Sequence, residues 1–346
     1  MKLLNINPDK YLYKTMIGTG GIGSGMFFLL NGSHTLGREE SRSGRLENRK
    51  DYCKLHIISH YVQMLLGTGL SVIPVGSVGV DEVGTRLLFE MNEAGIKTRY
   101  VESDPDRPTL FSFCFIYPDN SGGNMTTDDS ASSSVSPSSI IKARNEFINY
   151  SGKGIALAVP EVPLRTREQL LHLGTEYNFF RVASFTSEEM DEVTGSDILK
   201  HVDLLAINLD EASKAVKSNS INEPQIVAEL SVKVFCSINP DIRLSITNGK
   251  HGSWIWDGSD LSFFPALNLE VVSTAGAGDA FISGVIAGLT AGLTLKEAQQ
   301  VGTLTGGASV TSPHTINKEI NRSMLRNLTV SPGFSFSTKV LKLLED

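Results

Sequence analysis

A short segment between residues 273 and 281 combines small residues with one acidic residue, a pattern that can hold an anion and move a proton. It reads Ser-Thr-Ala-Gly-Ala-Gly-Asp-Ala-Phe and leads into an apolar stretch typical of a buried helix. If Gly276, Ala277 and Gly278 form the start of that helix, their backbone N–H groups have no intrahelical partner and can bind a phosphate oxygen. Asp279 in the same turn could take a proton from an attacking hydroxyl. The alternative is an ordinary acidic residue favoured by the helix dipole.

Two segments upstream also place polar residues at the ends of predicted strands. One strand, residues 202–207, is followed by Asn208, and Glu211 comes three residues later at the start of a helical stretch. A second strand begins at Arg243 and ends in polar and small residues, Thr247, Gly249 and Gly252. Parallel strands present their carboxyl ends at one edge of a sheet, so we expect the three segments to converge on one crevice.

Together the three segments resemble the motifs of the ribokinase-like (PfkB-type) carbohydrate kinases. The N-x-x-E, T-x-G-x-x-G and G-A-G-D elements occur in that order between Asp203 and Val310. The resemblance implies an α/β fold: a Rossmann-like three-layer αβα domain with a mostly parallel central sheet and a small β-sheet lid. It implies transfer of the γ-phosphoryl group of ATP to a hydroxyl of a sugar or sugar-like acceptor. A nucleoside (adenosine-type) kinase and a catalytically silent nucleotide-binding member of the family are the alternatives.

The resemblance also assigns roles to single residues. Asp279 would be the base, and the N–H groups of residues 275–278 would steady the phosphoryl oxygens in transfer. Glu211, with Asn208, would orient Mg²⁺ through water. The implied nucleotide-binding set is Asn208, Glu211, Thr247, Gly249, Gly252, Thr274, Ala275, Gly307 and Ser309.

The acceptor side departs from the family pattern. Ser273 stands where the family usually has an Asp that contributes to a monovalent-cation site, so use of such a cation is doubtful. The sugar-binding Asp of the first strand is replaced by Gly23 or Ser24, and residues 51–54 take the place of a Gly-Gly hinge. The candidate acceptor-binding residues are Gly20, Gly23, Ser24 and Arg42.

A run of basic residues lies in the same region. Arg38, Arg42, Arg45 and Arg49 are interleaved with acidic residues, which is typical of a solvated face. The alternative hypothesis is that one or two of them bind an anionic group on the acceptor, because the planar guanidinium can hold phosphate or carboxylate bidentately.

The elements that must position these residues alternate between strand and helix from Gly67 onward, as in a parallel sheet covered on both faces. We expect strands at residues 71–75, 154–159, 177–183, 202–207, 243–247 and 269–272, and helices at 81–93, 166–173 and 226–235. The chain, residues 1–346, would form one such domain. Strands from about 24–50 and 97–127, including 98–101, 111–117 and a hairpin turn at Asn31-Gly32, would form the lid, a possible homodimer surface.

Other motifs are weaker. The segment 18–23 matches G-x-G-x-x-G, but glycines soon after it interrupt the helix that a dinucleotide site needs, so we favour a strand end that allows close backbone approach. His56 and His60 have helical spacing without a third ligand, so a buried pair is favoured over zinc. The formal net charge of −7 disfavours nucleic-acid binding. The first residues lack a signal-peptide pattern and no stretch is long enough to span a membrane, so a cytoplasmic location is expected.

Overall fold

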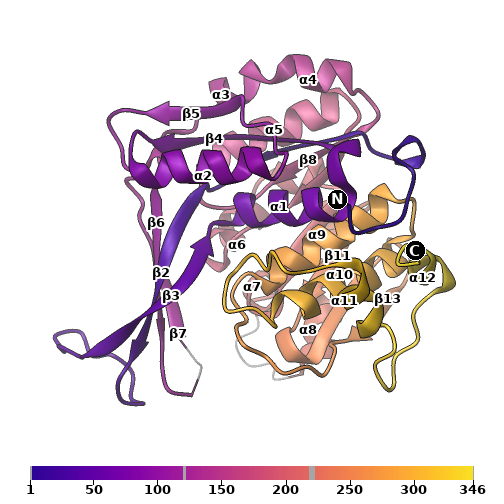
Figure 1. Ribbon diagram of the computed structural model, residues 1–346. Coiled ribbons are helices and arrows are strands. Elements are labelled where there is room, and N and C mark those ends of the chain that lie inside the picture. The colour runs from indigo at the N-terminus through magenta and orange to yellow at the C-terminus, as the bar shows by residue number, and fades with distance from the viewer. Residues whose placement is uncertain (1, 120–121, 218–222, 346) are drawn as a thin grey trace.

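The computed structural model describes residues 2–119, 122–217 and 223–345. Its main sheet has nine strands in the order β13-β12-β11-β10-β9-β8-β1-β4-β5 (Figure 1). They are β1 (Thr15–Thr19), β4 (Ser71–Gly79), β5 (Tyr100–Asp104), β8 (Gly154–Ala158), β9 (Phe180–Ala183), β10 (Leu204–Asn208), β11 (Arg243–Thr247), β12 (Gly252–Trp256) and β13 (Leu261–Pro265). In sheet order, the strands from β11 through β10, β9, β8, β1 and β4 to β5 all pair in parallel. Strand β12 pairs antiparallel with both β11 and β13. The predicted mostly parallel sheet is confirmed.

Helices cover both faces of this sheet, because each face is a continuous row of apolar side chains that water would otherwise contact. One face packs against α1 (Lys54–Leu66), α2 (Glu82–Glu93), α9 (Ala277–Thr290), α10 (Leu295–Ser309), α11 (Arg322–Leu328) and α12 (Thr338–Lys342). The other packs against α3 (Pro137–Lys142), α4 (Arg144–Asn149), α5 (Leu164–Glu176), α6 (Met190–Thr194), α7 (Leu209–Ala215) and α8 (Pro224–Ile238). The domain therefore has three layers. None of the helices among the described residues is long and apolar enough to cross a membrane.

A second, smaller sheet projects from the main domain at the lower left of Figure 1. Its strands run in the order β3-β2-β6-β7 and comprise β2 (Gly23–Leu30), β3 (Gly44–Tyr52), β6 (Leu110–Ile116) and β7 (Gly122–Thr126). β2 pairs antiparallel with β3 and parallel with β6. We call this four-stranded sheet the lid.

Three local expectations were wrong. The strand expected in the lid at residues 98–101 is β5, which pairs with β4 at the edge of the main sheet. No two-residue turn forms at Asn31-Gly32, because residues 31–43 make a long connection between β2 and β3. Residues 269–272 form no strand: the N–H groups of Val272 and Ser273 donate to the carbonyl of Val310 at the end of α10 instead of to a neighbouring strand.

Helices α9 and α10 lie unusually close together because glycine faces backbone between them. A Cβ atom on Gly284 would lie 2.7 Å from the Cα of Gly302, and one on Gly288 would lie 2.8 Å from the Cα of Ala298. Such distances leave no room for a side chain. The helix whose first turn carries the G-A-G-D motif is thus fixed against its neighbour along its length.

The junction between the lid and α1 is short and well bonded. β3 ends at Tyr52 and α1 begins at Lys54, with Cys53 between them. The Tyr52 N–H donates to Thr315 Oγ1 and its hydroxyl to Glu90 Oε2, while the Cys53 N–H donates to the Gly23 carbonyl. Three separate parts of the chain therefore hold this junction in place.

Candidate active site

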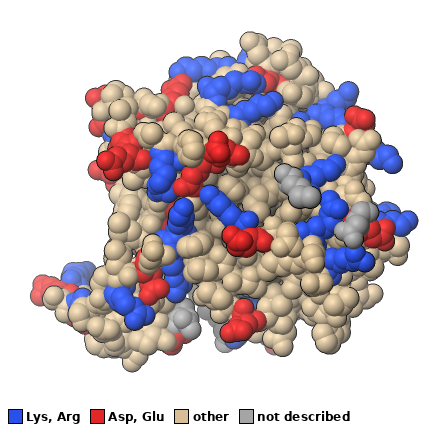
Figure 2. Space-filling model, in the orientation of Figure 1, with Lys and Arg blue, Asp and Glu red and all other residues tan. Residues whose placement is uncertain are grey.

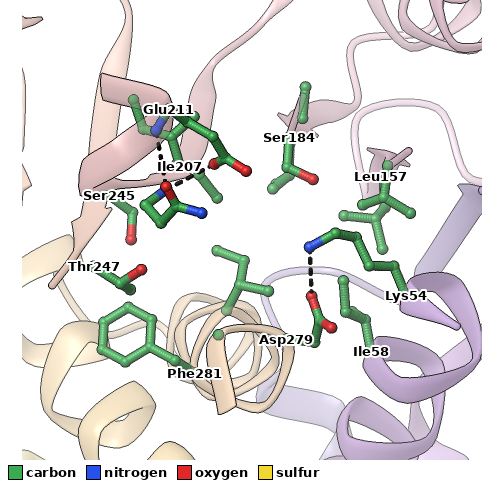
Figure 3. A pocket seen from close by; sticks show the side chains of 17 residues that line it. Lys54, Ile58, Leu157, Ser184, Ile207, Glu211, Ser245, Thr247, Asp279 and Phe281 are labelled. Atoms are coloured by element: carbon green, nitrogen blue, oxygen red, sulfur yellow. Dashed lines mark hydrogen bonds and ion pairs between the residues drawn. The ribbon is translucent and has the colours of Figure 1, made fainter. Parts of the chain in front are cut away.

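A cavity lies at the carboxyl ends of the parallel strands, between α1, α7 and α9 (Figure 3). All three predicted segments contribute to its wall. The polar and small residues that line it include Lys54, Ser184, Asn208, Glu211, Thr247, Gly278 and Asp279. The predicted meeting of the three segments at one sheet edge is thus observed.

The first turn of α9 presents open backbone donors to this cavity. Gly276 caps the helix with φ of 76°, a left-handed conformation that glycine adopts without strain. The N–H of Ala277 donates to the Thr274 carbonyl and that of Ala275 to the Ser273 hydroxyl, so two of the four predicted donors are already used. Gly276 and Gly278 keep free N–H groups within the described part of the chain, and a Cβ on Gly278 would meet nothing within 4 Å. This is a cradle that fits an anionic oxygen.

Asp279 lies beside this cradle and forms an ion pair with Lys54. The Lys54 ammonium is 3.2 Å from Asp279 Oδ1, and the two side chains are 35% and 14% exposed (Figure 3). The nearby carboxylate of Asp279 raises the pKa of Lys54, although burial opposes the shift. The site therefore contains a carboxylate with a permanently charged neighbour, both within reach of a bound ligand.

Glu211 and Asn208 form a reciprocal cap at the start of α7. The Asn208 side chain accepts from the Glu211 N–H, and Glu211 Oε2 accepts from the Asn208 N–H, each at 2.8 Å. This pairing explains why an N-x-x-E sequence begins a helix here. Oε1 of Glu211 is left over, and the side chain extends into the cavity (Figure 3). Burial raises the pKa of Glu211, and the Lys54 charge counteracts this.

Glu161 brings a further carboxyl group to the α1 end of the site. Its Oε2 accepts from the Lys54 backbone N–H at 3.3 Å. A Cβ on Gly21 would lie 2.2 Å from the same oxygen, so a glycine is required there. Burial raises the pKa of Glu161 to about 7, and the Lys54 charge opposes this. Glu161 itself has φ of 78°, a conformation uncommon for a residue with a side chain, and such strain clusters at functional sites.

Sequence reasoning missed Lys54 and Glu161 as site residues. Neither belongs to a recognisable motif, and they come from parts of the chain more than 100 positions apart that the main sheet brings together. The available signal for Lys54 was its position in the segment that replaces the expected Gly-Gly hinge.

Several predicted nucleotide-binding residues shape the backbone outside the cavity wall. Gly249 and Gly252 have φ of 49° and 127° in the turn between β11 and β12. Gly307 lies against Leu267, and the Ser309 hydroxyl donates to the Gly306 carbonyl in the last turn of α10. Thr274 accepts from the Ala277 N–H through its carbonyl.

The predicted acceptor residues are placed differently from one another. A Cβ on Gly20 would lie 2.3 Å from Val159 Cγ2, and one on Gly23 would lie 2.8 Å from Cys53 Sγ, so both allow close packing at the base of the lid. β1 leads through residues 20–22 into strand β2 without a helix, which excludes the helix-opening dinucleotide loop considered for this segment. The Ser24 hydroxyl donates to the Asp51 carbonyl.

Three of the four arginines of the basic run, Arg42, Arg45 and Arg49, are paired with acidic residues. Arg42 is bound to Glu40 and to the His34 carbonyl in the 31–43 connection, away from the cavity wall. Arg45 and Arg49 both contact Glu47. Figure 2 shows basic and acidic side chains interleaved over α2 and the lid. This arrangement favours the solvated-face interpretation of the basic run.

Comparison with known proteins gives a consistent result. The family model described as pfkB family carbohydrate kinase matches residues 63–322. The ribokinase of Bacillus subtilis is 23% identical over 244 residues, which are 70% of this chain and 76% of that protein. Among solved structures, the ribokinase of Giardia lamblia has a TM-score of 0.76 at 17% identity, covering 90% of this chain and 99% of that one. A Burkholderia thailandensis nucleoside kinase in complex with inosine has a TM-score of 0.72 at 17% identity, covering 92% and 98%.

Proposed function

This chain belongs to the pfkB family of carbohydrate kinases, and on that premise we propose that it transfers the γ-phosphoryl group of ATP to a hydroxyl of a sugar or sugar-like acceptor. The observation that carries the proposal is the meeting of Asp279 and the open N–H groups of α9 in a cavity that also contains Glu211. The whole chain would act as one ribokinase-like unit with the lid over the acceptor. Such an enzyme would work where ATP is supplied, which is the cytoplasm.

Asp279 would act as the base. As the acceptor oxygen bonds to phosphorus, its proton moves to a carboxylate oxygen of Asp279, and the bond between phosphorus and the departing ADP oxygen breaks. The N–H groups of Gly276 and Gly278 would stabilise the phosphoryl oxygens, because they are fixed in place and need no reorganisation. The close contact of α9 with α10 supports this role.

Lys54 would hold Asp279 in position and lie beside the phosphoryl group in transfer. Its ammonium already contacts the Asp279 carboxylate, which holds that carboxylate in place at the cavity wall. A cation at this point also offsets negative charge as the phosphoryl group moves.

The donor set also fits Mg²⁺, a hard cation that prefers oxygen ligands and retains several waters. Glu211 Oε1 is not used by the helix cap and extends into the cavity. Glu211 would hold the ion through water, and Asn208 would support Glu211. Bound Mg²⁺ would supply charge neutralisation for the triphosphate. Because Ser273 stands where the family usually has an Asp, a monovalent cation is not proposed.

An acceptor screen tests the proposed function. ATP consumption is measured with D-ribose, D-fructose, myo-inositol, adenosine and inosine, and the product is identified by mass. Asp279→Asn serves as the matched control, because the amide keeps the shape of the side chain and loses its basicity. Preference for adenosine or inosine would favour the nucleoside-kinase alternative. Binding of ATP without turnover of any acceptor would favour the catalytically silent alternative.

We also propose that the lid forms a homodimer through its outer face. Met26, Phe28, Leu46, Phe113 and Met125 share one face of the lid in the strand register. Three of them are 45–57% exposed. The opposite face carries Asp51, Ser112 and Cys114. The exposed apolar side chains of the first face support self-association, since a second copy would remove them from water.

Light scattering coupled to size exclusion tests this dimer. The double variant Met26→Lys, Leu46→Lys should elute as a monomer where the unchanged protein elutes as a dimer. Val330→Lys is the control, because Val330 is 80% exposed on a different part of the surface. A monomeric unchanged protein at the concentrations used for activity would contradict the proposal.

A further inference from the structure

The lid carries a buried acidic side chain close to the start of α1. Asp51 is the next-to-last residue of β3, three positions before Lys54. It lies opposite Gly25 of β2, where a Cβ would be 2.2 Å from Asp51 Oδ2 and 2.1 Å from Ser112 Oγ. Because glycine has no side chain, Gly25 leaves the space that the Asp51 carboxyl group and the Ser112 hydroxyl occupy.

The surroundings of Asp51 are unusual for a buried carboxyl group. The residue is only 6% exposed, and Oδ2 accepts from the hydroxyl of Ser112 at 2.5 Å. The thiol of Cys114 lies 3.8 Å from Oδ2 and 3.5 Å from Asn124 Oδ1, so these two oxygens share its single proton. In the part of the chain that the structure describes, no lysine or arginine forms an ion pair with it. Burial raises its pKa. A carboxyl group buried without a cation destabilises the fold, so its presence calls for a functional reason.

Two other carboxyl groups, those of Asp279 and Glu161, lie near the same end of α1 as Asp51. The charge of Asp279 contributes to the raised pKa of Asp51, and the charges of Asp279 and Asp51 both contribute to that of Glu161. Lys54 connects the three groups geometrically. It follows Asp51 by three residues, its backbone N–H donates to Glu161 Oε2 at 3.3 Å, and its ammonium lies 3.2 Å from Asp279 Oδ1. Lys54 is the cation among them, and it is paired with Asp279.

We infer that Asp51 is an acceptor-binding and specificity-determining residue, which selects acceptors that offer hydroxyl or ammonium donors and rejects those with an anionic group at this point. The inference rests on the proposed kinase function. A carboxylate has about four lone-pair positions, and the neutral donors around Asp51 leave some of them for a ligand. Like charges at close range are strongly unfavourable in a water-poor site, so a phosphate or carboxylate facing the Asp51 carboxylate would be repelled.

This inference replaces the hypothesis that lid arginines bind an anionic acceptor. Arg42, Arg45 and Arg49 are occupied by Glu40 and Glu47, whereas Asp51 has only neutral partners. The carboxylate that Gly23 and Ser24 of β2 lack would thus be supplied by the neighbouring strand β3.

The test combines paired acceptors with the variant Asp51→Asn. D-fructose is compared with D-fructose 6-phosphate, and myo-inositol with 2-dehydro-3-deoxygluconate, in steady-state kinetics and in equilibrium binding by calorimetry. In the unchanged enzyme the neutral member of each pair should have the higher kcat/KM. Asp51→Asn should raise KM for the best neutral acceptor about tenfold or more, because a hydrogen bond to a charged group is lost, and should leave KM for ATP unchanged.

Two controls separate recognition from folding. Glu47→Gln makes the same carboxyl-to-amide change four residues earlier on β3 and should leave both KM values unchanged. The melting temperature of Asp51→Asn should equal or exceed that of the unchanged protein, since the variant removes an uncompensated buried charge. A purely structural role would instead lower the melting temperature and leave acceptor KM unaltered.

The outcomes distinguish this inference from the proposed function. Turnover with preference for the anionic acceptors, or an unchanged acceptor KM in Asp51→Asn, would overturn the role of Asp51 and leave the kinase function intact. Absence of turnover with every acceptor would overturn the function. Calorimetry then decides the inference separately, because a failure of all neutral acceptors to bind would reject it too.

Discussion

The proposed nucleotide side and the proposed acceptor side of the site are built in different ways. On the nucleotide side, the helix cap of Asn208 and Glu211 and the open N–H groups of α9 depend on residues close together in sequence. On the acceptor side, Asp51, Lys54 and Glu161 come from β3, α1 and the segment after β8. A site built from residues close together in sequence constrains the local sequence and so produces motifs. A site built from distant segments can receive the same chemical group from a different strand. A family can therefore keep one donor and change its acceptors.

The largest effect is expected at Asp279, where the two sides meet. Asp279→Asn should lower kcat ~100-fold or more, because the base is lost while the shape of the side chain is kept. KM for ATP and the melting temperature should change little. Rapid-quench measurement of phosphoryl transfer checks this at the chemical step. Turnover like that of the unchanged enzyme would show that Asp279 is not the base. The two sides of the site would then not meet at this residue.

Lys54 should follow. Lys54→Met should lower kcat about 10- to 100-fold, since a cation beside the phosphoryl group and the base is lost. Lys50→Met is the matched control: it is 58% exposed and 3.9 Å from Glu90. An effect on KM for ATP alone would move Lys54 to the nucleotide side.

Glu161 offers a test by pH. Its pKa of about 7 in the folded protein exceeds the usual value of 4.5, so the folded state binds more protons between these values and stability falls as pH rises through that window. Glu161→Gln has no such group, so its stability relative to the unchanged protein should increase from pH 4.5 to 7, by roughly 3 kcal/mol. Urea unfolding at both pH values measures it. Glu188→Gln, on the surface, should show no such trend.

The smallest effect is expected at Glu211. Glu211→Gln should raise the Mg²⁺ concentration for half-maximal rate several-fold, because a neutral amide holds the water shell of the ion less firmly. The amide can still cap α7, so stability should change little. Asp210→Asn, an exposed carboxylate next to it, is the control. A Mg²⁺ titration that matches the unchanged enzyme would rule out this role.

The same contrast explains how much could be predicted from the sequence. The parallel sheet, the start of α9 and the cap at Asn208 could be predicted, because apolar periodicity and capping residues report local backbone structure. Residues 269–272 have the apolar pattern of a strand, yet their backbone bonds to the end of α10, which only the tertiary arrangement decides. β5 could not be assigned to its sheet for the same reason.

The acceptor side was the harder part. The position of the Asp51 carboxyl group depends on Gly25 and Ser112 of neighbouring strands. That of Glu161 depends on Gly21 and the Lys54 N–H. Single residues of this kind follow no regular spacing in the sequence, so no motif identifies them. The segment 51–54 was recognised as unusual only because it stands where the family has glycines.

The short junction between β3 and α1 has a consequence for the speed of the catalytic cycle. Tyr52 is hydrogen-bonded to Thr315 and Glu90, and Cys53 to Gly23. The Gly-Gly hinge of the family pattern would allow free backbone rotation at this point. A lid that cannot pivot there opens less readily, and in many enzymes such opening limits release of the product. The rate-limiting event of this enzyme is therefore expected to be departure of the phosphorylated product, seen as a burst of product in the first turnover followed by a slower steady rate.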